Sequence, residues 1–289
     1  ANLLADFDAD SLAVEPNFPV LLADIMRSRG FAIEPDRDLF VSERRRKTPA
    51  EIEALTRAQA RAERAVSDAV EILTESHIAD DSLLYRGVPL TAERLRGELV
   101  ARLAGDDYLA ESMIIAPGPG SSDPHWEGTG PIRPHQPIIL DIFPQDRQSR
   151  YHGDVTRTVV KGEASPQVTR MFTSVEKAHA VAIGMIRAGV NGHDVHLAVQ
   201  ASFVADGYGE DGPHAARFTH GTGHGLGLEV HELPRISRID MELLEGDVVT
   251  VEPGLYDPAI GGVRLEDVVV VTSDGHRNLN SLPKTLVVP

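Results

Sequence analysis

The sequence contains no cysteine among its 289 residues. This absence excludes disulfide bonds, cysteine-ligated zinc or iron–sulfur sites, and a cysteine nucleophile. No apolar stretch approaches the ~18 residues that a transmembrane helix needs. The first residues also lack the basic and then apolar pattern of a signal peptide. We therefore expect a cytoplasmic protein that does not enter a membrane.

Basic residues are scarce relative to acidic ones. The chain has 28 lysines and arginines against 44 aspartates and glutamates, which gives a net charge of -16 at pH 7. This balance argues against nucleic acid and anionic membranes as main partners, because both repel an acidic surface. The basic run Arg44-Arg45-Arg46-Lys47 is short and holds no aromatic residue. We interpret it as a solvated linker.

The chain is predicted to have a small leading unit, residues 1–43, and a larger domain, residues 44–289. In the leading unit, Pro19 to Arg29 has apolar residues at helical spacing, and Gly30 follows as a stop signal. The short apolar stretch Leu39 to Val41 is predicted to be a strand.

The larger domain repeats one order of elements, two helices and then strands. Its first helix begins at Thr48, where Pro49 and Glu51 give the pattern of a capping box. The other predicted elements are a helix from 91, strands over 112–116, 137–143 and 152–161, helices over 165–189 and 191–207, and strands over 246–255 and 262–272. The recurrence predicts an α+β fold in which two related halves share an antiparallel sheet with helices on one side.

Several acidic residues stand in apolar or glycine-rich segments that are typical of buried strands. With one histidine they form the set Asp141, Asp154, His224, Glu252 and Glu266. A carboxylate in an apolar strand is costly unless it is paired or binds a cation. One such acid alone could simply cap a turn. The whole set would nearly neutralise two divalent ions, with Mn²⁺ favoured and Co²⁺, Zn²⁺ or Fe²⁺ as alternatives.

Other polar residues near these segments have two interpretations. His125 and His231 are either structural or, beside a metal centre, proton carriers or oxyanion donors. Arg157 and Arg264 flank the acids and could neutralise them. The glycine-rich stretch from His220 to Gly227 lets backbone approach a ligand. No helical pattern follows it, which argues against dinucleotide binding.

These segments resemble the metallopeptidase superfamily of methionine aminopeptidase, prolidase and aminopeptidase P. The resemblance covers about residues 44–289. It rests on the Asp pair, the His220–Gly227 stretch, Val251-Glu252-Pro253-Gly254 and Gly262-Val263-Arg264-Leu265-Glu266-Asp267. It implies the pita-bread fold, with two pseudo-symmetric helix-helix-strand halves around a curved antiparallel sheet.

The resemblance implies a role for each member of the acidic set. Asp141 would hold one metal ion through both carboxylate oxygens. Asp154 and Glu266 would bridge two divalent ions, and His224 and Glu252 would complete the second ion's ligands. The implied centre is therefore dinuclear.

The resemblance also implies roles for the residues around the metals. His125 and His231 match the family's substrate and proton-transfer histidines. Glu252 would share in moving the proton. His220 and Arg264 match positions that contact the proline side of a substrate, so they are predicted to bind it.

The motif Arg264-Leu265-Glu266-Asp267 is similar to that of the Xaa-Pro branch of the superfamily. This implies a homodimeric, metal-dependent hydrolase acting on proline-containing peptides, of the Xaa-Pro dipeptidase or aminopeptidase P type. A methionine aminopeptidase-like enzyme and a non-catalytic pita-bread binding module are the alternatives. Asp154 follows Asp141 by 13 residues, a longer spacing than is usual in the family, and we expect a lengthened loop around 145–149. The leading unit is shorter than the family's usual amino-terminal domain and is interpreted as a truncated one.

Overall fold

The computed structural model describes residues 9–289, and the chain forms two compact units that divide after Arg44. In the described part of the first unit, strands β1 (Ser11–Val14) and β2 (Ala32–Pro35) pair in parallel around helix α2 (Val20–Ser28). Helix α2 confirms the helix predicted there. The strand predicted over Leu39 to Val41 is wrong: Phe40 has a φ of 62°, and helix α3 (Val41–Arg45) begins directly after it. A left-handed residue interrupts an extended strand.

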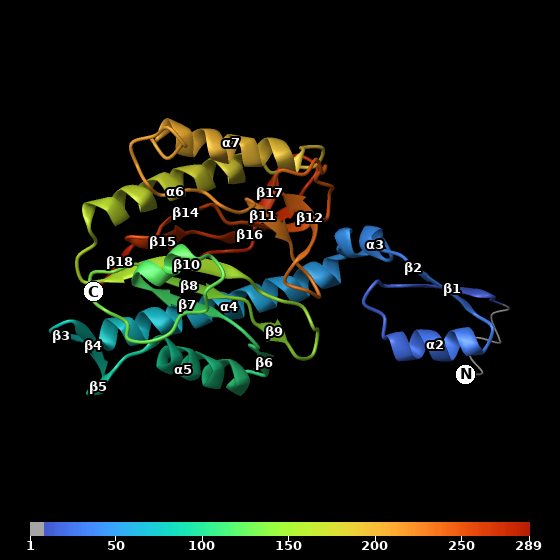
Figure 1. Cartoon of the computed structure of the whole chain (residues 1–289), viewed down its shortest axis with the longest axis horizontal. Coiled ribbons are helices and arrows are strands. Elements are labelled where there is room, and N and C mark those ends of the chain that lie inside the picture. Colours follow the sequence, from blue (N-terminus) through green and yellow to red (C-terminus); the bar gives the residue numbers. More distant parts are fainter. Residues whose placement is uncertain (1–8) are drawn as a thin grey trace. The chain divides into compact units, whose positions relative to one another are not determined.

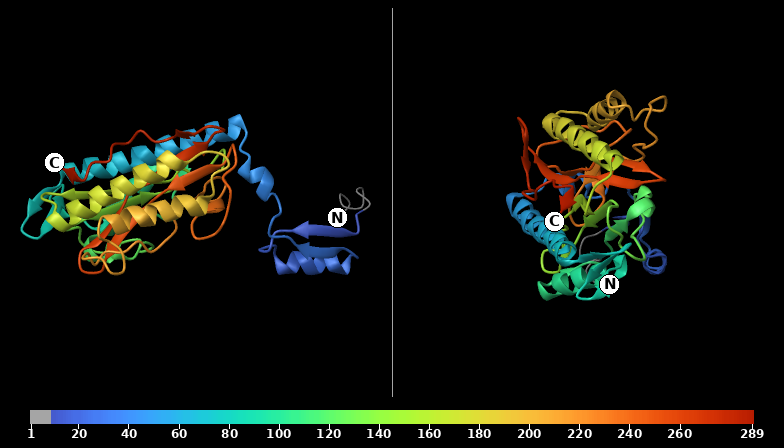
Figure 2. Two further views of the ribbon diagram at one scale, coloured as in Figure 1. Left: turned by 90° about the horizontal axis from the view of Figure 1, so that it is seen from above. Right: turned by 90° about the vertical axis from the view of Figure 1, so that its left-hand side faces the viewer.

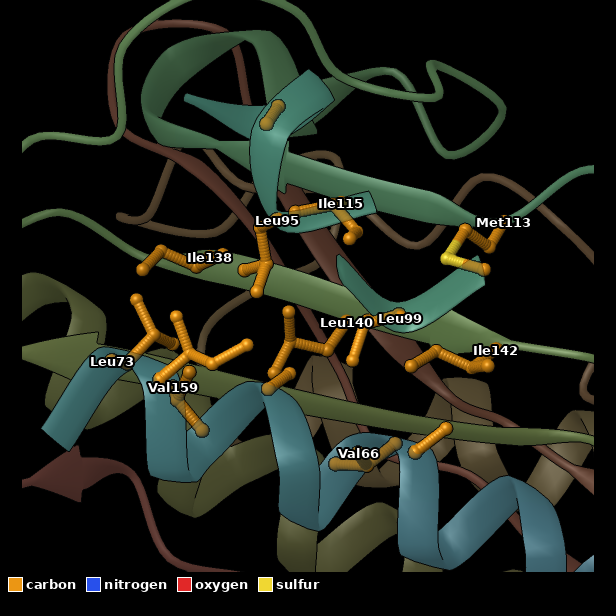
Figure 3. Close-up of a cluster of buried hydrophobic side chains, with 14 of the residues drawn as sticks. Val66, Leu73, Leu95, Leu99, Met113, Ile115, Ile138, Leu140, Ile142 and Val159 are labelled. Carbon is orange, nitrogen blue, oxygen red and sulfur yellow. The ribbon is translucent and has the colours of Figure 1, made fainter. Parts of the chain in front are cut away.

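The second unit begins with two helices that pack on a sheet. Helix α4 (Pro49–Glu75) starts with the predicted capping box of Thr48 and Glu51, and helix α5 (Ala92–Gly105) is capped by Thr91. Both helices bury apolar stripes, and Figure 3 shows side chains of α4 and α5 meeting those of the sheet beneath them. The apolar periodicity of the sequence thus predicts this layer correctly.

The sheet under α4 and α5 has the strand order β18-β10-β8-β7. Its strands are β7 (Ile114–Pro117), β8 (Ile138–Ile142), β10 (Val155–Lys161) and β18 (Val287–Val288). The pairs are antiparallel, except that β10 and β18 run in parallel. Shorter elements accompany it: β3 (His77–Ala79), β4 (Ser82–Tyr85), β5 (Val88–Pro89), β6 (Tyr108–Leu109), β9 (Gln145–Asp146) and the 3-10 helix η1 (Gly118–Ser122).

The second half repeats this arrangement. Helices α6 (Pro166–Met185) and α7 (Gly192–Ala205) lie over an antiparallel sheet of order β12-β11-β13-β16-β17 and a β14–β15 ribbon. The strands are β11 (Gly223–Gly225), β12 (Glu232–Ile236), β13 (Val248–Val251), β14 (Gly254–Asp257), β15 (Gly261–Arg264), β16 (Asp267–Val271) and β17 (His276–Asn278).

The two halves meet along strand β10. The Glu266 backbone N–H donates to Thr156 O at 3.1 Å, and the Thr158 hydroxyl donates to Arg264 O at 2.9 Å. In Figure 1 the strands of both halves lie between the helix pair α4–α5 and the helix pair α6–α7, and the right-hand view of Figure 2 shows the same arrangement. The α+β class predicted from the sequence is confirmed, but the strands of the two halves form separate sheets that meet at β10 rather than one shared sheet.

Two residues of the basic run form ion pairs with the domain: Lys47 is buried and Arg45 is partly buried. Arg45 pairs with Asp247 at 2.6 Å, and the Asp247 side chain is 0% exposed. Lys47 pairs with Glu232 at 3.2 Å, with both side chains almost inaccessible to solvent. Buried charges persist only with a partner of opposite sign, so the interpretation of this run as a solvated linker is wrong. Within residues 9–289, no helix is both long and apolar enough to cross a membrane.

Candidate metal centre

Three residues from distant parts of the chain converge at the junction of the two halves. Atoms of Asp154, His224 and Glu266 that could ligate a metal all lie within 4.8 Å of one another, and all three residues are buried. Asp154 immediately precedes β10, His224 lies in β11, and Glu266 links β15 to β16. The meeting of β10 with β15 and β16 therefore creates the cluster.

The strand register places Asp141 beside this cluster. Asp141 in β8 pairs with Thr156 in β10. Asp154 stands two residues before Thr156, so it lies diagonally across from Asp141 on the same face of the sheet. The long connection between the two aspartates folds into a compact turn, in which Ser149 donates to Asp146 at 2.6 Å.

Glu252 approaches the cluster from the end of β13. Its Oε1 lies 3.4 Å from His224 Nε2, and Asp154 Oδ2 lies 3.8 Å from the same nitrogen. The Glu252 backbone N–H donates to Thr222 O at 2.8 Å, which ties this segment to the glycine-rich stretch. Two carboxylates thus face one imidazole nitrogen.

The buried groups leave a deficit of positive charge. Burial raises the pKa of Asp154 well above its ordinary value, and the charges of Glu266, Asp141 and Glu252 raise it further. Burial and the charge of Glu252 raise the pKa of Glu266 in the same way, and burial and Asp141 raise that of Glu252 to about 7. Divalent cations would supply the missing charge, so the donor set fits metal ions.

Neighbouring groups orient the candidate ligands. His224 Nδ1 donates to Gly225 O at 3.1 Å, because a carbonyl can only accept, and this leaves Nε2 unprotonated and directed at the cluster. The Thr156 hydroxyl donates to Glu266 Oε2 at 2.7 Å. Burial and the nearby His231 lower the pKa of His224 to about 3. A neutral imidazole is the form that binds a metal.

Arg264 is engaged with the cluster itself. Its Nη2 donates to Asp141 Oδ2 at 2.6 Å, and its Nη1 donates to the Tyr256 hydroxyl at 2.8 Å. The Tyr256 hydroxyl in turn donates to His220 Nε2 at 2.7 Å, since His220 Nδ1 already donates to Gly221 O. In this structure the side chains of His220 and Arg264 form hydrogen bonds within the protein. Their substrate-binding roles stay predictions.

Tyr256 is a site residue that the sequence reasoning missed. A Cβ atom on Gly254 would lie 2.5 Å from its hydroxyl, and one on Gly262 would lie 2.7 Å from its ring. Glycines in both family-like motifs therefore make room for this aromatic ring. A tyrosine between two such motifs is the signal that could have revealed it.

A cavity of about 630 Å³ opens over the cluster. Every site residue predicted from the sequence lines it: Asp141, Asp154, His224, Glu252, Glu266, His125, His231, His220 and Arg264. His231 packs edge-on against His224 with ring centroids 4.3 Å apart. Arg235, which the sequence reasoning also missed, lines the same cavity. The convergence of these side chains in one hollow makes this the candidate active site.

The raised carboxylate pKa values predict how the chelated protein responds to pH. Between the ordinary and the raised pKa, the folded carboxylates bind more protons than the unfolded ones, so stability falls as pH rises. Buried histidines such as His224 act in the opposite sense, but only below their ordinary pKa of 6.5. We therefore expect the melting temperature in EDTA to fall as pH rises from 6.5 through the raised pKa of Glu252 at about 7, with Asp154 and Glu266 acting in the same direction.

Scanning fluorimetry across this pH range tests the expectation. Saturating Mn²⁺ should reverse the slope, because metal binding needs deprotonated ligands and stabilises the folded state by mass action. The Glu266→Gln variant in EDTA should show a shallower slope than the wild type. A melting temperature in EDTA that is flat or rises with pH would contradict the assigned pKa shifts.

Known proteins match both the sequence and the fold. The model of metallopeptidase family M24 matches residues 53–273. An uncharacterized peptidase of Bacillus subtilis, YqhT, is 36% identical over 230 residues, covering 77% of this chain and 63% of that protein. The Xaa-Pro dipeptidase of Pyrococcus horikoshii is 29% identical over 281 residues, covering 96% of this chain and 75% of the relative. The chain thus spans less than two thirds of the length of the Bacillus relative.

Solved structures agree with these matches. The prolidase from Pyrococcus horikoshii superposes with a TM-score of 0.82 at 27% identity, covering 96% of this chain and 76% of that one. The X-Pro aminopeptidase from Thermotoga maritima gives a TM-score of 0.83 at 28% identity, covering 99% and 78%. These neighbours confirm the pita-bread fold that the sequence resemblance implied. The chain belongs to metallopeptidase family M24.

Proposed function

We propose that this chain is a dinuclear-metal exopeptidase that hydrolyses the bond between an N-terminal residue and a following proline. The observation that carries the proposal is the meeting of Asp154, His224 and Glu266 at the floor of the cavity. Relatives named Xaa-Pro dipeptidase and a structural neighbour named X-Pro aminopeptidase support the substrate class.

The metal ions would be held by the acidic set around His224. Asp154 and Glu266, one from each half, would be shared by the two ions, and Asp141, His224 and Glu252 would complete the ligand set. Mn²⁺ is the ion we favour, because most of the donors are carboxylate oxygens. When bound, such ions supply Lewis-acid polarisation of a carbonyl and a lowered pKa for water.

The chain's own residues would then handle the proton and the developing charge. The amide nitrogen of proline is a poor leaving group until it is protonated, so a proton carrier beside the scissile bond is needed. Glu252 and His231 line the cavity on the side of His224 and can serve this need. His125 is exposed at the cavity wall, where it can contact the substrate.

Arg235 offers a place for the free carboxylate of a dipeptide. It pairs with His224 across the β11–β12 ladder, so both side chains point to the same face. After burial, its charge lowers the pKa of His231, and after burial and His231 it also lowers that of His224. At Glu252 it opposes the rise in pKa that burial causes. A guanidinium that lines the cavity in this way suits a carboxylate ligand. This supports the dipeptidase type over the aminopeptidase P type.

Replacing Arg235 by glutamine should therefore change the length preference. We expect a loss of about 10- to 100-fold in kcat/KM for Ala-Pro, the worth of a charge-assisted hydrogen bond, with little change for Ala-Pro-Ala amide. The exposed Arg238→Gln variant is the control and should keep the wild-type ratio. Equal losses on both substrates would show that Arg235 does not read the carboxylate.

Peptide hydrolysis with defined metals tests the proposed function. The chelated protein is supplied with Mn²⁺, Co²⁺ or Zn²⁺ and assayed on Ala-Pro, Ala-Pro-Ala and Met-Ala. We expect cleavage of the proline peptides, strongest with Mn²⁺. Preferential cleavage of Met-Ala would favour a methionine aminopeptidase-like enzyme. Absence of both metal uptake and hydrolysis would favour a non-catalytic binding module.

The homodimer and the cytoplasmic location stay predictions. Light scattering coupled to size-exclusion chromatography tests the first, with a mass of twice 31.3 kDa as the expected result for a dimer of this chain. The interpretation of the leading unit as a truncated amino-terminal domain also stays a prediction.

A further inference from the structure

A glutamine on helix α4 holds the backbone of Asp154. The Gln59 side chain is 0% exposed and belongs to the helix face that packs on the first sheet. Its Nε2 donates to Asp154 O at 2.7 Å, and its Oε1 accepts from the Asp154 N–H at 2.8 Å. One carboxamide thus satisfies both backbone groups of one residue, 95 positions away in the sequence.

The sheet provides no partner for Asp154 at this point. The β8–β10 ladder ends with the pair Ile142 and Val155, so Asp154 lies one residue beyond it. A carboxamide has the same donor and acceptor as a peptide group and here replaces the missing strand. A buried backbone group left without a partner is costly, so the two hydrogen bonds hold this segment in place.

The preceding glycine allows the helix to come close enough. A Cβ atom on Gly153 would lie 2.4 Å from Ala58 O and 2.9 Å from Gln59 N. No other residue type fits at position 153 without moving the helix, because every other side chain begins with this carbon. The glycine before Asp154 and the glutamine on α4 therefore form one contact between helix and strand.

We propose that Gln59 is a positioning residue that fixes the Asp154 carboxylate for metal binding. The inference rests on the proposed function, in which Asp154 bridges two ions. Gln59 does not line the cavity, so it acts only through the Asp154 backbone. Ligands must be held close to their productive geometry before the metal arrives, and the neutral amide does so without adding charge to a crowded acidic cluster.

Mn²⁺ titration calorimetry on the chelated protein tests the proposal. The Gln59→Met variant keeps the volume and removes both hydrogen bonds, and we expect its Mn²⁺ affinity to fall by about 10- to 100-fold. The matched control is Leu73→Ala, also buried on α4 but in the apolar cluster. It should lower the melting temperature at least as much while leaving Mn²⁺ affinity within about 3-fold, since it removes no contact to a ligand residue.

A second variant covers the case in which Gln59→Met does not fold. Gln59→Asn keeps the amide but is too short to make both bonds, so it should also weaken Mn²⁺ binding. Wild-type Mn²⁺ affinity in a folded Gln59 variant would overturn the inference, and so would an equal loss in Leu73→Ala. In both cases, wild-type cleavage of Ala-Pro would leave the proposed function standing. A wild-type protein that bound none of Mn²⁺, Co²⁺ and Zn²⁺ would overturn both proposals.

Discussion

Replacing Asp154 by asparagine is expected to abolish Mn²⁺ binding and peptidase activity while raising the stability of the chelated protein. Asparagine keeps the shape of the side chain but has one oxygen instead of two, so it cannot bridge two ions. It also removes one charge from a buried site where Glu266, Asp141 and Glu252 already repel each other. The same substitution therefore removes function and relieves electrostatic strain.

The loss of activity should exceed that from any residue outside the ligand set. Removing a group that only supports a ligand typically costs 10- to 100-fold. Since Asp154 is proposed to be a ligand itself, we expect kcat/KM on Ala-Pro to fall by at least about 10³-fold in Asp154→Asn. Elemental analysis after dialysis against Mn²⁺ should find less metal than in the wild type. The melting temperature in EDTA at pH 8 should be higher than that of the wild type.

Two further variants make this prediction decisive. Glu266→Gln should behave like Asp154→Asn, because Glu266 belongs to the same buried cluster. Glu53→Gln removes a carboxylate that is 75% exposed on α4 and should leave metal content, activity and stability unchanged. Retention of more than about a tenth of wild-type activity in Asp154→Asn would contradict a bridging role, given the cost expected for a ligand.

The sequence predicts the helices well because their signals are local. The Thr48 capping box and the apolar stripe of α4 each depend only on residues of that one segment, and both are present in the structure. The acidic set was also recognisable, since a charged residue inside an apolar strand is unusual wherever its partners lie. All of its members line one cavity.

Outside the acidic set, contacts between individual residues of distant segments were not predicted. Gln59 and Arg45 reach residues 95 and 202 positions away, and nothing in their own segments identifies the partner. Arg45 lies in a run that has the composition of a solvated surface, but its side chain forms an ion pair with the buried Asp247. The partners in such polar contacts can be identified only once the fold is known.

The strand predicted at Phe40 is wrong for a local reason. Phe40 has a left-handed backbone, which is rare for a bulky residue and which its sequence does not indicate.

The second large effect is expected at His231, which stands at the cavity wall beside His224. Burial and the charge of Arg235 lower the pKa of His231 below 6.5, so the imidazole is neutral at pH 8. A neutral imidazole can donate a hydrogen bond to a developing oxyanion or pass a proton toward the leaving nitrogen. We expect His231→Ala to lower kcat on Ala-Pro by about 10²- to 10³-fold, the usual cost of losing such a donor.

The pattern of the loss distinguishes catalysis from support of the metal site. KM and Mn²⁺ affinity should stay within about 3-fold of the wild type, because His231 touches a ligand only through its ring edge. His231→Asn retains a donor but cannot carry a proton, so partial recovery of kcat would identify oxyanion stabilisation, and none would identify proton transfer. His193→Ala on α7 is the control for losing a histidine that does not line the cavity. A parallel fall in kcat and Mn²⁺ affinity would assign His231 to the support of His224 instead.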